Sequence, residues 1–117
     1  MIKYTLRKDS FENIESIITK DVINLFCDEG TPFFRTYGNF EELFTIFISE
    51  DYSLSTNSRL TINIIGVSKK DQTEVNVLVS GGKVGFIWET SYGSENRRAK
   101  SICEIFKQNG FVLINEK

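Results

Sequence analysis

The sequence predicts a single α+β domain over residues 1–117, an antiparallel β-meander with two helices packed on one face, in the order β-α-β-β-β-β-α-β. Residues 60–79 alternate apolar and polar side chains on either side of a polar connection, the pattern of two paired strands. Residues 11–26 and 99–106 repeat apolar side chains at helical spacing. Because each helix has one apolar stripe, we expect both helices to cover the same face of the sheet.

The N-terminal third is expected to form a strand and then a helix. Residues 2–7 alternate apolar and polar side chains, as a half-buried strand does. Asp9 and Glu12 have the spacing of a capping box, which places the helix N-terminus at Asp9. Gly30 and Pro32 are expected to end this helix.

Two strands are predicted next, a short one at 33–37 and a longer one from 40 to 52. The longer strand is apolar on both sides, which a sheet with one buried face does not need. Alternation places on one side Phe44, Ile46 and Ile48, and on the other Leu43, Thr45, Phe47 and Ser49.

After the two paired strands, Gly81 and Gly82 predict a tight turn into a further extended segment, 84–88. Gly93 is expected to end this segment and Ser94 to cap the second helix. Gly110 follows the apolar stripe as a helix-ending residue, and 111–114 is apolar enough to return as the last strand.

Composition excludes several classes of chemistry. The chain has no histidine, which removes histidine bases, Ser-His and Cys-His pairs and nearly every familiar zinc site, and no cofactor or metal is expected. A net charge of −2 with dispersed basic residues does not suit nucleic acid. Cys27 and Cys103 form no C-x-x-C motif, and no apolar run suits a signal peptide or a membrane span. We therefore expect a cytoplasmic protein.

A binding surface is expected on the sheet face away from the main core. The predicted interface residues are Leu43, Phe47, Ile65 and Leu78. A face that mixes apolar side chains with hydroxyls and amides suits a homodimer contact or a small-molecule pocket. The competing interpretation is that a loop or the terminal strand covers this face.

A second candidate site is a small anion pocket near the glycine turn. Lys83 lies in the glycine cluster at 80–85, whose amides could form a nest, and Trp88, Tyr92 and Ser94 lead into the expected helix N-terminus. The simpler interpretation is a glycine hairpin with an exposed lysine, a core tryptophan and a cap.

Part of the chain resembles a family of small uncharacterised bacterial proteins. The matching residues are Leu60-Thr61-Ile62-Asn63-Ile64, Val79-Ser80-Gly81-Gly82, Trp88, Tyr92-Gly93-Ser94-Glu95 and Asn109-Gly110-Phe111. The resemblance implies an α+β fold and a bacterial cytoplasmic setting, and it carries over no catalytic residue.

The expected function is that of a non-enzymatic binding or interaction domain that self-associates through a sheet face or an edge strand. Two alternatives remain open: a domain that binds a small anionic ligand near Lys83 and Trp88, and an inhibitor or immunity-type partner of another protein.

Overall fold

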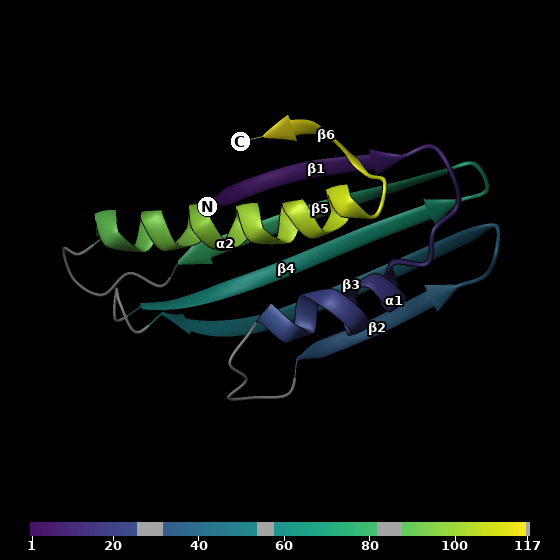
Figure 1. Ribbon diagram of the computed structural model, residues 1–117. Helices are drawn as coiled ribbons and strands as arrows, with labels where there is room; N and C mark the ends of the chain where they lie inside the picture. Colours follow the sequence, from purple (N-terminus) through teal and green to yellow (C-terminus); the bar gives the residue numbers. More distant parts are fainter. Residues whose placement is uncertain (26–31, 54–57, 82–87, 117) are drawn as a thin grey trace.

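The computed structural model describes residues 1–25, 32–53, 58–81 and 88–116, with only the backbone described for 51–53, 58 and 88–95. Its first helical segment, α1, continues through a π-helical turn, Ile18–Val22, and a 3₁₀ turn, Ile23–Leu25 (Figure 1). The elements are β1 (Ile2–Lys8), α1 (Ile14–Ile17), β2 (Phe33–Gly38), β3 (Glu42–Ser53), β4 (Ser58–Lys69), β5 (Gln72–Gly81), α2 (Trp88–Gln108) and β6 (Val112–Glu116).

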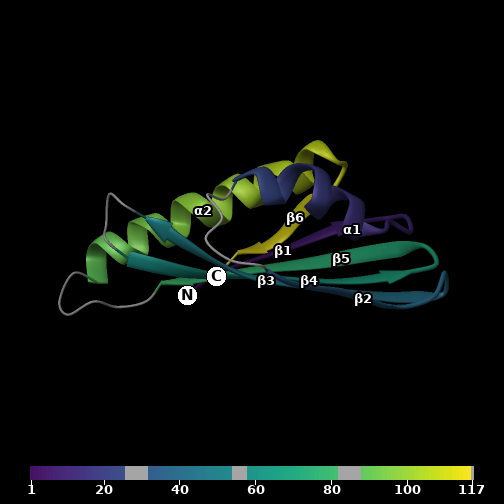
Figure 2. The same cartoon turned by 90° about the horizontal axis from the view of Figure 1, so that it is seen from below.

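The strands form one six-stranded sheet in the order β2-β3-β4-β5-β1-β6, and every neighbouring pair is antiparallel. Strands β2, β3, β4 and β5 follow one another in the sheet as a meander. Strand β1 pairs with the side of β5 that faces away from β4. Both helices lie on one side of the sheet (Figure 2). The predicted fold class and element order are therefore confirmed.

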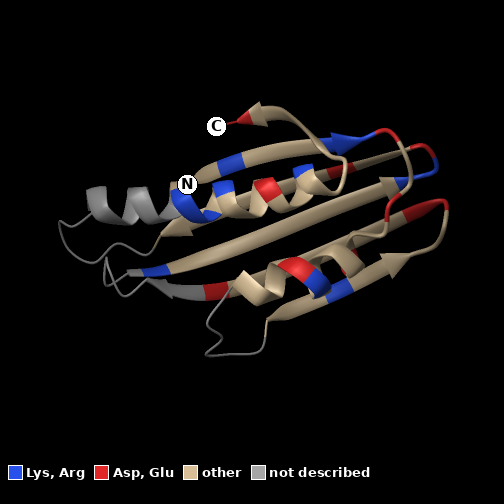
Figure 3. Ribbon diagram, in the orientation of Figure 1, with Lys and Arg blue, Asp and Glu red and all other residues tan. Residues whose placement is uncertain are grey.

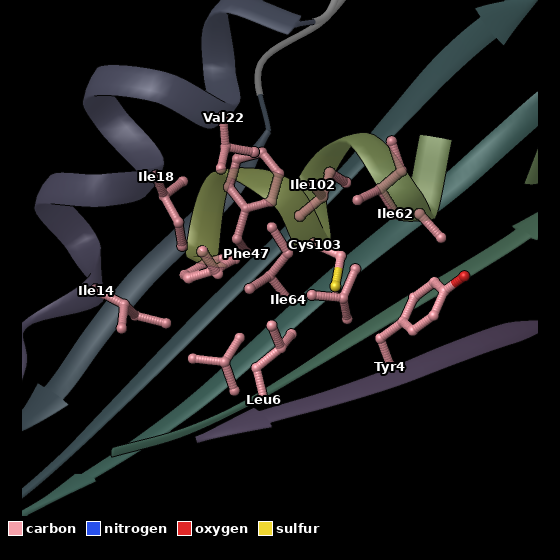
Figure 4. Close-up of a cluster of buried hydrophobic side chains, with 14 of the residues drawn as sticks. Tyr4, Leu6, Ile14, Ile18, Val22, Phe47, Ile62, Ile64, Ile102 and Cys103 are labelled. Carbon is pink, nitrogen blue, oxygen red and sulfur yellow. The ribbon is translucent and has the colours of Figure 1, made fainter. Parts of the chain in front are cut away.

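The core lies between the sheet and this helical layer. Val75, Val77 and Val79 of β5 are fully buried, as their alternation predicted. The apolar stripe of α2 is also buried, with Ile105 only partly so, as helical spacing predicted. The side chains that fill the centre come from both helical segments and from four strands, β1, β3, β4 and β5. Figure 4 shows among them Tyr4, Leu6, Ile14, Ile18, Val22, Phe47, Ile62, Ile64, Ile102 and Cys103.

The predicted start of the first helix at Asp9 is wrong. The helix begins at Ile14, and its N-cap is Asn13, whose Oδ1 accepts from the Glu15 amide at 3.1 Å. The connection before it is bonded to the sheet instead, since Thr73 Oγ1 accepts from the Glu12 amide at 2.8 Å. Ser68 Oγ donates to the Glu12 carbonyl at 2.5 Å. These sheet hydroxyls hold residue 12 outside the helix and so delay its start.

Gly66 sets how closely α1 approaches the sheet. A Cβ at Gly66 would stand 3.0 Å from Ile14 Cγ1 and closer still to its Cδ1. The missing side chain therefore provides the space that Ile14 fills in the core.

The second helix also differs from its predicted bounds at one end. It starts at Trp88 and continues through Gly93 and Ser94, so the expected cap at Ser94 is wrong. The predicted turn at Gly82 and most of the segment 84–88 lie outside the described residues. At the other end Gly110 has a φ of 92° and ends the helix as expected.

The C-terminus of α2 is a Schellman motif. The Gly110 amide donates to the Lys107 carbonyl and the Phe111 amide to the Phe106 carbonyl, both at 3.0 Å. The rings of Phe106 and Phe111 meet edge to face with centroids 5.4 Å apart. This contact turns the chain back towards β6.

Candidate functional site: the uncovered face of the sheet

Strand β3 has its more apolar side turned away from the helices. Thr45, Phe47 and Ser49 are buried on the helical side. Alternation therefore puts Phe44, Ile46 and Ile48 on the opposite side, which the described helices leave uncovered (Figure 2). A sheet with one solvated face normally shows the reverse pattern, with hydroxyls outside and large apolar side chains inside.

The strand register extends this apolar surface across four strands. We define the open face as three rows that run from β2 to β5: Tyr37, Phe44, Val67 and Glu74; Arg35, Ile46, Ile65 and Asn76; Phe33, Ile48, Asn63 and Leu78. Five large side chains of these rows keep about two fifths or more of their surface exposed: Phe33 46%, Tyr37 53%, Phe44 40%, Ile48 38% and Ile65 39%.

The open face changes from apolar to polar along the strand order. Its β2, β3 and β4 side carries the rings and the isoleucines, whereas its β5 side continues into polar contacts with β1. Arg7 of β1 pairs with Glu74 at 3.7 Å, and Thr5 Oγ1 donates to Asn76 Oδ1 at 2.7 Å. The face therefore has an apolar half and a hydrogen-bonding half.

Arg35 is the one charged side chain in the β2 part of the described open face, and it is held in place. Its guanidinium carbon lies 5.0 Å from the centre of the Phe33 ring, and Nη1 donates to the Phe34 carbonyl at 2.8 Å. A stacked guanidinium keeps its charge while it covers apolar surface. Such an arginine suits a protein contact better than a freely rotating one.

The interface residues expected from the sequence divide between the two faces. Ile65 and Leu78 lie on the open face, where the sequence placed them. Leu43 pairs with the buried Ser68 and so belongs to the helical side. Phe47 is 0% exposed, packs edge to face on Phe34 at 5.5 Å and points into the core (Figure 4). The prediction that Phe47 contacts a partner is wrong.

Sequence reasoning missed five side chains of the open face as candidate surface residues: Phe33, Tyr37, Phe44, Ile46 and Ile48. Alternation shows which side chains of residues 40–52 share a side, but the predicted interface contains Leu43 and Phe47, which places the side of Phe44 towards the core. The available signal was that both sides of this strand are apolar. Because helices cover only one face of the sheet, one of the two apolar sides has to be exposed.

The anion site expected around the second helix loses its geometric basis. Lys83 lies outside the described residues. The free amides of a helix belong to its first turn, which starts at Trp88, and Ser94 falls in the second turn. Tyr92 and Ser94 therefore do not precede a helix N-terminus, as the expected pocket required.

Two observations on the described residues concern reactive side chains. The described residues contain no group of three or more metal-ligating side chains. Cys103 is a free thiol in the core, and burial raises its pKa above 9.0, which opposes nucleophile formation.

Positive and negative side chains are interspersed along the described ribbon (Figure 3). In the described part of the chain, no helix is long and apolar enough to cross a membrane.

Comparison with models of protein families, with curated proteins and with solved structures finds nothing that matches this chain. The open face is thus described from its own residues alone.

Proposed function

We propose that this protein is a non-enzymatic interaction domain of the cytoplasm that self-associates through the open face of its sheet. The observation that carries the proposal is the inverted pattern of β3, where Phe44, Ile46 and Ile48 face outward and Thr45 and Ser49 face the core. Burying a large apolar side chain contributes about 1.5–3 kcal/mol of free energy. The outward side chains are still partly exposed, so a partner that covers them would gain much of this free energy.

The size of the face agrees with this role. The molecule extends 46 × 28 × 19 Å, so its broad side offers an outline of about 1000 Å². Standard interfaces bury about 800 Å² on each partner. A second copy laid on the open face would cover its apolar rows in a single contact.

Association through the face is favoured over association through the β2 edge. Pairing two β2 strands about their centre would bring Arg35 of each copy together, and like charges opposite each other destabilise a strand pair. Arg35 also occupies the Phe34 carbonyl with its own guanidinium. A charge in the middle of an edge strand is a known device against edge pairing.

The absence of histidine from the sequence and the burial of Cys103 support a non-enzymatic role. A different protein bound by the same face, as an inhibitor or immunity-type domain would bind its target, is the second candidate. This second candidate uses the same residues of the open face and differs only in the protein that binds to them.

The test is native mass spectrometry and sedimentation of the purified protein between about 1 and 100 μM, a range in which interfaces of standard size commonly assemble. The wild type is expected to dimerise. The variant Ile48→Lys/Ile65→Lys, which places two charges on the open face, is expected to be a folded monomer.

The matched control is Thr19→Lys/Gln108→Lys, which adds the same charges at exposed positions of the helical layer. It should dimerise as the wild type does. A wild type that stays monomeric throughout the range contradicts self-association and leaves a different protein as the occupant. A dimer insensitive to the Ile48→Lys/Ile65→Lys change contradicts the open face.

A further inference from the structure

We infer that the free edge of β2 is a selective strand-addition site, in which Arg35 excludes the β2 strand of a second copy and accepts an extended strand that carries a carboxylate opposite it. The inference concerns the edge of the sheet and stands whether or not the open face self-associates. It follows from three exposed side chains, Phe33, Arg35 and Tyr37, which alternate along a strand at the edge of the sheet.

Strands β2 and β6 lie at opposite edges of the sheet and differ in their fitness for strand addition (Figure 1). Within the described residues β2 pairs with β3 alone, and the backbone groups on the other side of an edge strand are a template for an added strand. The register of β6 on β1 shifts between Thr5 and Leu6 and leaves Ile114 without a partner on β1. A bulge of this kind opposes strand addition, so β2 is the more suitable edge.

The length of β2 restricts the register of an added antiparallel strand. Pro32 precedes the strand and has no amide hydrogen to donate. Gly38 ends it with a φ of 115°, which is not an extended conformation. An added strand therefore pairs with the whole of residues 33–37 only when it is centred opposite Arg35.

The β2 strand of a second copy fits this register at every position except one. Phe33 of each copy would lie opposite Tyr37 of the other, and aromatic pairs across two strands are favourable. Arg35 would lie opposite the same residue of the second copy, and like charges directly opposite each other destabilise a strand pair. No acidic residue of β2 compensates for this repulsion.

Arg35 is arranged to accept an acidic side chain instead. Its guanidinium carbon lies 5.0 Å from the centre of the Phe33 ring, and Nη1 donates to the Phe34 carbonyl at 2.8 Å. These contacts reduce the rotamer freedom lost on binding, and the other N–H groups are left for a carboxylate. Long side chains reach diagonal neighbours across a strand pair, so a glutamate opposite Arg35 reaches a guanidinium that leans towards Phe33.

The test uses a variant of the same chain as the acidic strand. Arg35→Glu puts a carboxylate at the centre of β2, so a pair formed with the wild type has opposite charges at this position. In the equimolar mixture, hydrogen exchange of the β2 amides should slow by about tenfold or more relative to either protein alone. Native mass spectrometry should show species larger than those of the separate proteins. Contact through the open face pairs no amide of the edge, so exchange at β2 reports the edge alone.

The matched control is Arg59→Glu mixed with the wild type. Arg59 is an exposed arginine of β4, a strand with neighbours on both sides. This mixture should keep the β2 exchange rates and the masses of the separate proteins.

Two further variants test the repulsion directly. Arg35→Thr removes the charge and introduces a residue that suits strands, so β2 should pair with the β2 strand of a second copy and its amides should become protected. Arg35→Lys keeps the charge and should leave the edge open, as in the wild type.

The inference is overturned if the β2 amides of the mixture with Arg35→Glu exchange as fast as those of the separate proteins. It is also overturned if Arg35→Thr leaves the edge as open as in the wild type, or if Arg35→Lys pairs as Arg35→Thr does. The open face is judged separately, by the effect of Ile48→Lys/Ile65→Lys on the dimer.

Discussion

At the scale of single residues, Phe47 and Ile65 show how one register position decides between two roles. Phe47 pairs with Ile64 across β3 and β4, while Ile65, the next residue, points to the other side of the sheet. The Phe47 side chain is fully buried, whereas Ile65 keeps 39% of its surface exposed.

Substituting the two side chains should therefore affect different properties, stability for Phe47 and association for Ile65. Phe47→Ala is expected to lower the free energy of unfolding by about 3–5 kcal/mol, the range for a large ring removed from a packed core. Ile65→Thr should change monomer stability by less than about 1 kcal/mol but should weaken association. Urea unfolding of a dilute sample measures the first effect and sedimentation the second. Equal losses of stability would contradict the assignment of the faces.

Gly66 and Ile14 are expected to be coupled in stability. Gly66→Ala should cost about 1–3 kcal/mol, because the new methyl group overlaps the end of the Ile14 side chain. Ile14→Val removes Cδ1 and should recover part of that loss. Urea unfolding of the four proteins in a double-mutant cycle measures the coupling, and strict additivity would argue against a close contact.

Cys103 predicts a dependence of stability on alkaline pH. Burial is the main cause that raises its pKa, so the folded protein favours the neutral thiol more than the unfolded chain does. Its contribution to stability is complete below about pH 9.0 and is lost as the pH rises through the folded pKa. Unfolding of wild type and Cys103→Ala between pH 7 and 10.5 should show a steeper alkaline decline for the wild type.

At the scale of elements, the two helix starts differ from prediction for different reasons. Asp9 and Glu12 fit a capping box by spacing, but the amide of Glu12 is taken by Thr73, a residue far away in sequence. Local spacing contains no information about that competitor. In α2 the helix continues through Gly93, because glycine only lowers helix propensity and does not forbid a helix.

The end of α2 was predictable, because its signal is local. Gly110 adopts the positive φ that side chains avoid, and the Schellman bonds form around it. Gly110→Ala should lower the free energy of unfolding by about 1 kcal/mol. Gln108→Ala, an exposed change within the same last turn, should alter it by less than about 0.5 kcal/mol. Urea unfolding compares the two, and an equal effect would contradict the strain at Gly110.

Strand β3 marks the limit of prediction for the candidate surface. Alternation correctly grouped its side chains, but Phe44, Ile46 and Ile48 look like core residues to any rule that places apolar side chains inside. Which side the helices cover depends on Ile14, Ile18 and Ile102, which reach the sheet from distant parts of the chain.

At the scale of the whole molecule, the fold class and element order were predictable, whereas the position of β1 between β5 and β6 was not. Hairpin connections predict neighbouring strands in the meander. Placing β1 requires knowledge of where the first helix crosses the sheet, and that crossing is set by tertiary packing.

Association through an apolar face should also leave a thermal signature. Removing apolar surface from water lowers the heat capacity, so the dimerisation ΔCp should be negative and of the order of 0.2–0.4 kcal/mol/K in magnitude. Dilution calorimetry at several temperatures measures it. A value near zero would argue against an apolar contact of this size.

The pairing of Tyr4 with Glu116 has a consequence for engineering the molecule. It brings the first and last strands side by side at the edge opposite β2 (Figure 1). A short peptide could join the two ends, and the exposed β4–β5 turn at Lys70 and Asp71 offers a place to open the chain instead. Reporter proteins fused at either original end would stand away from the Arg35 edge, so paired fluorescent fusions can follow assembly in living cells without crowding the contact.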